Sequence, residues 1–65
     1  MAVTESPRQA ALRRITEQQA RIARQRTLIA ALKANGSSTQ SAMESLGHMQ
    51  GTLSSLRDSL RLHPN

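Results

Sequence analysis

The feature that most constrains the fold is the regular spacing of apolar residues between Ala42 and Leu60. They occur at Ala42, Leu46, Met49, Leu53, Leu56 and Leu60, with successive steps of four, three, four, three and four residues. Steps that alternate between three and four place side chains on one side of an α-helix, at the a and d positions of a heptad repeat. This stripe predicts a helix that packs lengthwise against other helices.

A second stripe with the same spacing precedes it. It is formed by Ala11, Ile15, Gln18, Ile22, Gln25, Ile29 and Leu32, which fall on one arc of a helix at 100° per residue. Gln18 and Gln25 are its polar members, and two interpretations of them stay open. They either pack within the seam, where polar residues lower stability but fix register and oligomeric state, or they are half-exposed and bridged by water.

Capping signals mark the ends of both helices. Ser6, Pro7 and Gln9 form a helix start with a capping box, and Asn35-Gly36 is a typical stop. The hydroxyls of 37–39 can cap a second helix, which should end before Pro64. We expect a single domain over residues 1–65, with helix one at about 7–34, a turn at 35–38 and helix two at about 39–62. The fold class is all-α, an antiparallel helical hairpin, because short loops make helices antiparallel neighbours.

Composition indicates that one hairpin is a marginal fold. The chain has 65 residues, no cysteine and no aromatic residue, so it lacks disulfides and the largest core side chains. Leu12, Leu28 and Met43 flank the seam and would stay exposed in a lone hairpin. Oligomerisation is the remaining means of stabilisation, and we expect a homodimer that forms a four-helix bundle. The expected interface residues are Ile15, Gln18, Ile22, Gln25, Ile29, Leu32, Leu46, Met49, Leu53, Leu56 and Leu60.

One segment resembles a known family. The run from Arg21 to Leu32, RIARQRTLIAAL, followed by Asn35-Gly36, is similar to the core of a family of small bacterial helical proteins of unknown function. Its members carry an I-A-R-Q-R-x-L-I-x-x-L run, a glycine-containing loop and a second helix with regularly spaced Leu and Met. The resemblance covers about Gln18 to Leu60 and implies a bacterial helical hairpin, with no activity attached.

Positive charge is concentrated on the first helix. The net charge is +5, and the expected helix one carries Arg8, Arg13, Arg14, Arg21, Arg24, Arg26 and Lys33 against Glu17 alone. The arginine stripe, defined as Arg13, Arg14, Arg21 and Arg24, spans roughly 100° beside the seam. It would suit phosphates or an acidic protein surface. The alternative is a solvated face on which Glu17 pairs with Arg13 and Arg21.

Other candidate sites have simpler explanations. Gly47 and Gly51 either allow close helix approach or merely weaken the helix. His48 and His63, without cysteine, do not suggest a metal site, and no Ser-His-acid set fits one hairpin. We therefore expect no catalytic residues, no metal and no cofactor. Met1 to Pro7 lacks a secretory pattern and no apolar run could span a membrane, so we expect a cytoplasmic location.

These observations favour a non-enzymatic protein-protein interaction or scaffold module that acts through a helical-bundle surface. Its expected partners are a second copy of the chain and an unidentified protein. The alternative is a small basic RNA- or DNA-binding regulator that uses the arginine stripe. Without aromatic residues on which bases could stack, recognition of single strands would be weak.

Overall fold

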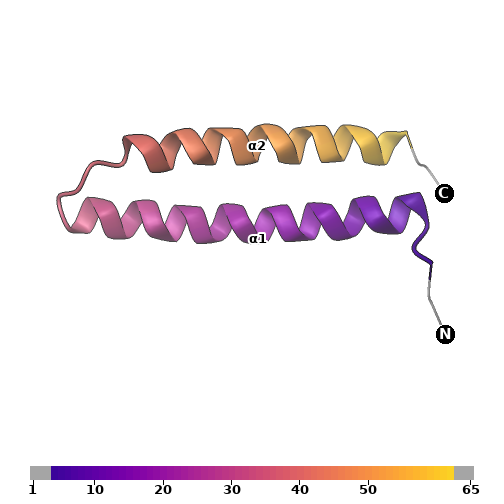
Figure 1. The fold of residues 1–65 in the computed structure, drawn as a ribbon, viewed down its shortest axis with the longest axis horizontal. Helices are drawn as coiled ribbons and strands as arrows, with labels where there is room; N and C mark the ends of the chain where they lie inside the picture. The colour runs from indigo at the N-terminus through magenta and orange to yellow at the C-terminus, as the bar shows by residue number, and fades with distance from the viewer. Residues whose placement is uncertain (1–3, 63–65) are drawn as a thin grey trace.

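The chain folds into two antiparallel α-helices joined by one short loop (Figure 1). The computed structural model describes residues 4–62. Helix α1 spans Pro7–Ala34 and α2 spans Gln40–Arg61, and no strand occurs within the described residues. The expected all-α hairpin is therefore confirmed. Helix α1 has the expected bounds, whereas α2 is one residue shorter at each end than the sequence suggested.

The start of α1 is fixed by a capping box. The backbone N–H of Gln9 donates to the Ser6 hydroxyl at 3.1 Å, and the backbone N–H of Ser6 donates to Gln9 Oε1 at 3.0 Å. Pro7 occupies the first helical position, where no backbone donor is needed. Two backbone donors that the helix leaves unpaired at its start are thereby satisfied.

The end of α1 forms a Schellman motif. The N–H of Ser37 donates to the Leu32 carbonyl at 2.9 Å, and the N–H of Gly36 donates to the Lys33 carbonyl at 3.1 Å. This geometry requires a left-handed residue, and Gly36 has a φ of 70°. The backbone thus reverses within a few residues and brings α2 back alongside α1.

The start of α2 differs from the expected hydroxyl cap. Thr39 is the residue before the helix, but its side chain caps no backbone donor and instead lies 3.6 Å from the Met43 sulfur. The N–H of Gln40 donates to the Ser38 hydroxyl at a long 3.4 Å. The Thr39 carbonyl accepts the first helical hydrogen bond, from the N–H of Met43 at 2.9 Å, and α2 itself begins at Gln40.

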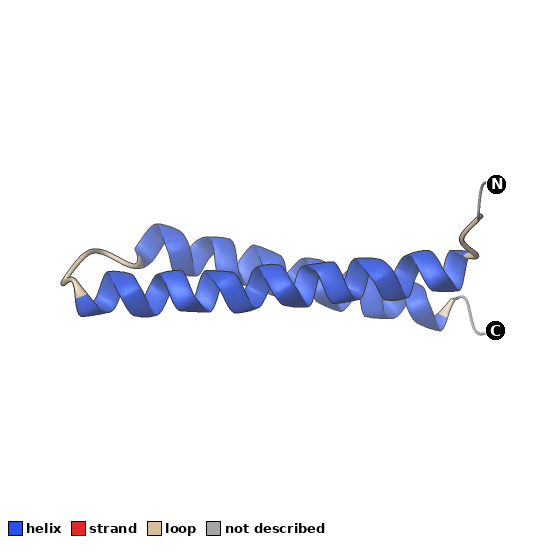
Figure 2. Cartoon of the chain, turned by 90° about the horizontal axis from the view of Figure 1, so that it is seen from below, coloured by secondary structure: helices blue, strands red, loops and turns tan. Residues whose placement is uncertain are grey.

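The core is the seam between the helices. Its buried members are Ala11, Gln18, Ile22, Ile29 and Ala42, and its half-buried members are Ile15, Gln25, Leu32, Leu46, Met49, Leu53, Leu56 and Leu60. The helices overlap for most of their length and cross at a shallow angle (Figure 2), as expected for heptad packing. No side chain of residues 4–62 is completely buried.

The molecule is a single thin layer. Its extents are 49 × 27 × 12 Å and its radius of gyration is 15.4 Å, against about 11 Å for a compact domain of this length. Both broad faces of the hairpin are consequently open to solvent.

Candidate interaction surfaces

Gln18 and Gln25 pack within the seam and bridge the two helices. The side-chain amide of Gln18 donates to the Met49 carbonyl at 3.1 Å, and that of Gln25 donates to the Ala42 carbonyl at 2.8 Å. The glutamines are seven residues apart, and so are their acceptors. Both bonds therefore form in the same antiparallel register, and the structure favours packing in the seam over bridging by water.

The seam contains no unpaired buried polar side-chain atom among the described residues. A carbonyl oxygen has two lone pairs, so Ala42 and Met49 can accept an amide proton in addition to their own helical hydrogen bond. Gln18 is only 7% exposed, and Gln25 is half-buried. Their polar groups thus cross the seam without the penalty that an unsatisfied group would carry.

The arginine stripe divides into residues with different surroundings, although all four are exposed. Arg13 lies between two carboxylates, with Nε 2.9 Å from Glu5 and Nη1 2.9 Å from Glu17. The hydrogen bonds that Arg13 donates to Glu5 and to Glu17 raise the pKa of Arg13, so it stays charged at any pH at which the protein would be studied. The expected pairing of Glu17 with Arg13 is present, whereas Glu17 and Arg21 form no ion pair within residues 4–62.

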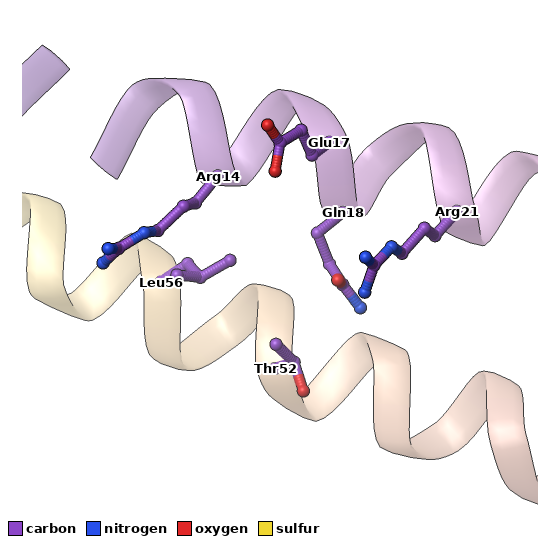
Figure 3. Close-up of a pocket in the computed structure, with 6 residues that line it drawn as sticks. All are labelled: Arg14, Glu17, Gln18, Arg21, Thr52 and Leu56. Carbon is purple, nitrogen blue, oxygen red and sulfur yellow. The ribbon is translucent and has the colours of Figure 1, made fainter. Parts of the chain in front are cut away.

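Arg14 and Arg21 border a shallow hollow between the helices (Figure 3). The hollow has a volume of about 200 Å³ and is lined by Arg14, Glu17, Gln18, Arg21, Thr52 and Leu56. Both arginines extend from α1 toward α2, whereas the Glu17 carboxylate stays beside α1. Arg14 and Arg21 belong to no ion pair within the described part of the chain, and Arg24 does not line the hollow.

Helix α2 carries a polar stripe on the same broad face, and sequence reasoning missed it. Its members are Ser41, Ser45, His48, Thr52, Ser55 and Ser59, all exposed and spaced by alternating steps of four and three. The signal was present in the sequence, because these polar residues have the same heptad spacing as the apolar stripe of α2. Thr52 brings this hydroxyl-rich stripe to the edge of the hollow.

The opposite broad face carries exposed apolar residues. Leu12 is 42% exposed and Met43 is 52% exposed. Leu12 follows the seam residue Ala11, and Met43 follows the seam residue Ala42. Because the two helices are antiparallel, residues that follow the seam in this way lie on the same side of the hairpin. Leu28, 47% exposed, precedes seam residue Ile29 and lies on the side of Arg14 and Thr52. We refer to these sides as the Leu12–Met43 face and the Arg14–Thr52 face.

The glycines of α2 have no steric role inside the hairpin. A Cβ atom built at Gly47 or Gly51 would meet nothing within 4 Å. Glycine in a helix interior lowers stability by about 1 kcal/mol relative to alanine. Their positions therefore have no explanation in the packing of α1 against α2.

Comparisons with protein-family models, curated proteins and solved structures find no match to this chain. The resemblance to small bacterial hairpin proteins consequently stays a prediction. Within residues 4–62, neither helix has the length and apolar character needed to cross a lipid bilayer. The same residues contain no cluster of three or more His, Cys, Asp or Glu side chains suited to a metal ion. His63, discussed above, lies outside the described residues.

Proposed function

We propose that the chain is a non-catalytic protein-protein interaction module that first pairs with a second copy of itself, forming a four-helix bundle. The observation that carries this proposal is the incomplete burial of the seam. No side chain of residues 4–62 is completely buried, and most of the seam is only half-buried. A second hairpin would bury more of this apolar surface without disulfides or metals.

The surface area supports the same proposal. The chain exposes 5016 Å², whereas a compact monomer of 7.1 kDa exposes about 4,100 Å². Each partner in an interface of ordinary size buries about 800 Å². The area that each hairpin would bury in such a dimer is thus close to the excess of its exposed area over that of a compact protein.

The exposed apolar residues suggest which face pairs. A twofold dimer uses the same surface patch of both copies. The Leu12–Met43 face offers one large apolar side chain from each helix, and Gly47, one helical turn from Met43, is small enough for close approach. Leu28 lies on the other face, and Leu62, 78% exposed, lies just past the end of α2. One broad face suffices for a dimer, so Leu28 would stay exposed in it.

The test is the mass of the protein in solution. Light scattering with refractive-index detection is appropriate, because the chain has no Trp or Tyr to absorb near 280 nm. We expect twice the chain mass at micromolar concentration, with dissociation and partial loss of helix on dilution. A folded monomer with unchanged helicity across that range would refute self-association.

A second candidate function is a small basic regulator that binds RNA or DNA. Two observations favour it: the excess of positive charge on α1 and the absence of ion pairs at Arg14 and Arg21 within the described residues. Binding to nucleic acid should weaken steeply with added salt, because arginines release counterions from phosphates. Absence of salt-dependent binding to either duplex DNA or structured RNA would exclude this candidate.

A further inference from the structure

The Arg14–Thr52 face combines two kinds of hydrogen-bond donor. Helix α1 supplies the guanidinium groups of Arg14 and Arg21, and α2 supplies the exposed hydroxyl-rich stripe that contains Ser45 and Thr52. Arginine guanidinium groups and Ser or Thr hydroxyls are typical donors to phosphate oxygens. Helix α2 places no carboxylate in this stripe, and Glu17 on α1 is bound to Arg13 at 2.9 Å. The face is therefore cationic and rich in donors.

The two guanidinium groups do not converge on one point. Arg14 and Arg21 are seven residues apart, which separates their Cα atoms by about 10 Å along the helix. Figure 3 shows Arg14 beside Leu56 and Arg21 beside Gln18, at opposite ends of the hollow. One small anion would contact one of them. A ligand that contacts both must carry negative charges repeated along its length.

Nucleic acid fits this arrangement better than an acidic protein does. Protein interfaces are anchored by buried aromatic or apolar side chains, and the hollow is lined by one apolar residue, Leu56. Phosphate groups recur at short intervals along a strand, about every 3.4 Å along the axis of duplex DNA. Binding of single strands needs aromatic platforms, which this chain lacks, whereas a duplex backbone needs only cations and donors.

We infer that the hollow bordered by Arg14, Arg21 and Thr52 is a contact site for the phosphate backbone of a duplex nucleic acid. The inference rests on the second candidate function and specifies where its ligand binds. Of the arginine stripe, only Arg14 and Arg21 contact phosphates. Arg13 instead holds the Glu5 and Glu17 carboxylates beside the start of α1, and Arg24 lies outside the hollow.

The experiment compares two variants that remove positive charge from α1. R14Q/R21Q alters the hollow, and R24Q alters an exposed cation that does not line it. Both proteins are first checked for parental helicity by circular dichroism. Binding of a labelled DNA duplex and a labelled RNA duplex is then measured by fluorescence anisotropy at several salt concentrations.

We expect the salt dependence of the R14Q/R21Q variant to fall by about two units in the slope of log K against log salt, since two phosphate contacts are lost. R24Q should change that slope by less than about half a unit. Equal effects of the two variants per charge removed would overturn the site and leave nucleic-acid binding standing. Failure of the parent protein to bind either duplex at low salt would overturn both. Displacement of a duplex by polyglutamate at equal charge concentration would overturn the preference for phosphate over carboxylate.

Discussion

At the scale of single residues, the two seam glutamines are hydrogen-bonded across the seam. Their amides bind carbonyls that already accept helical hydrogen bonds, so replacing them leaves no acceptor unsatisfied. We predict that Q18L/Q25L raises the melting temperature, because two apolar side chains then fill positions that amides occupy. The measurement is thermal unfolding followed by circular dichroism at fixed concentration.

The control for this prediction is Ala20, an exposed residue two positions from Gln18 on the side of α1 that faces away from the seam. A20L should change stability by no more than about 0.5 kcal/mol, as is usual for surface substitutions. If Q18L/Q25L leaves the melting temperature unchanged, the glutamines face water in solution. A rise accompanied by a mixture of oligomers would show that the amides also restrict the choice of assembly.

A second residue-scale prediction concerns Gly36, which has a φ of 70° in the Schellman motif. Alanine in this left-handed conformation is less stable by about 1–2 kcal/mol. G36A should therefore lower the free energy of unfolding by about that amount, measured by urea unfolding. Asparagine tolerates the conformation better, so G36N should lose less. Equal stability of all three proteins would mean that the turn adopts another geometry.

The local sequence predicted the cap and the turn of α1 but could not predict the contacts between segments that are distant along the chain. The capping box of Ser6 with Gln9 and the turn at Gly36 depend on neighbours along the chain, so they were predictable. The ion pair of Glu5 with Arg13 spans eight residues and depends on how the segment before the helix folds back. The partners of Gln18 and Gln25 depend on where α2 places its carbonyl groups, which no local pattern encodes.

At the scale of elements, α2 contains two glycines that the hairpin does not require. In an isolated hairpin, G47A/G51A should stabilise the helix by about 2 kcal/mol, since a Cβ at either position meets nothing within 4 Å. If Gly47 faces a second copy in the dimer, the same variant should weaken dimerisation. Circular dichroism at low concentration reports the first effect, and light scattering over a dilution series reports the second.

Ser55 provides the control, because it is exposed and belongs to the polar stripe on the other face. S55A should leave dimerisation unchanged. Unchanged dimerisation of G47A/G51A would mean that these glycines merely weaken α2. A loss of monomer stability would contradict the open space around them.

The bounds of the elements were largely predictable, because heptad spacing fixes both the helices and the faces they bury. The start of α2 was less certain, since three successive hydroxyl residues offered a cap and the observed cap is weak. The hollow beside Arg14 was not predictable. It depends on which α2 residues lie opposite α1, and that register follows from the loop and the packing of the seam together.

At the scale of the whole molecule, the main question is how a layer 12 Å thick becomes a stable protein. Of the exposed large apolar side chains within the two helices, Leu12 and Met43 lie on one broad face and Leu28 on the other, and Leu62 lies just past the end of α2. A dimer formed through one face leaves the Arg14–Thr52 face of both copies open. Self-association and binding of an anionic partner are therefore compatible functions of opposite surfaces.

This division gives a prediction with an internal control. L12K/M43K should dissociate the dimer, because it places two lysines from each copy in an interface where apolar contacts are expected. L28K changes a side chain of similar exposure on the other face, so it should remain dimeric with nearly parental stability. Light scattering gives the mass of each variant, and circular dichroism over a dilution series gives its stability. Dissociation by L28K but not by L12K/M43K would place the dimer interface on the Arg14–Thr52 face, and the two proposed surfaces would then compete for the same side of the hairpin.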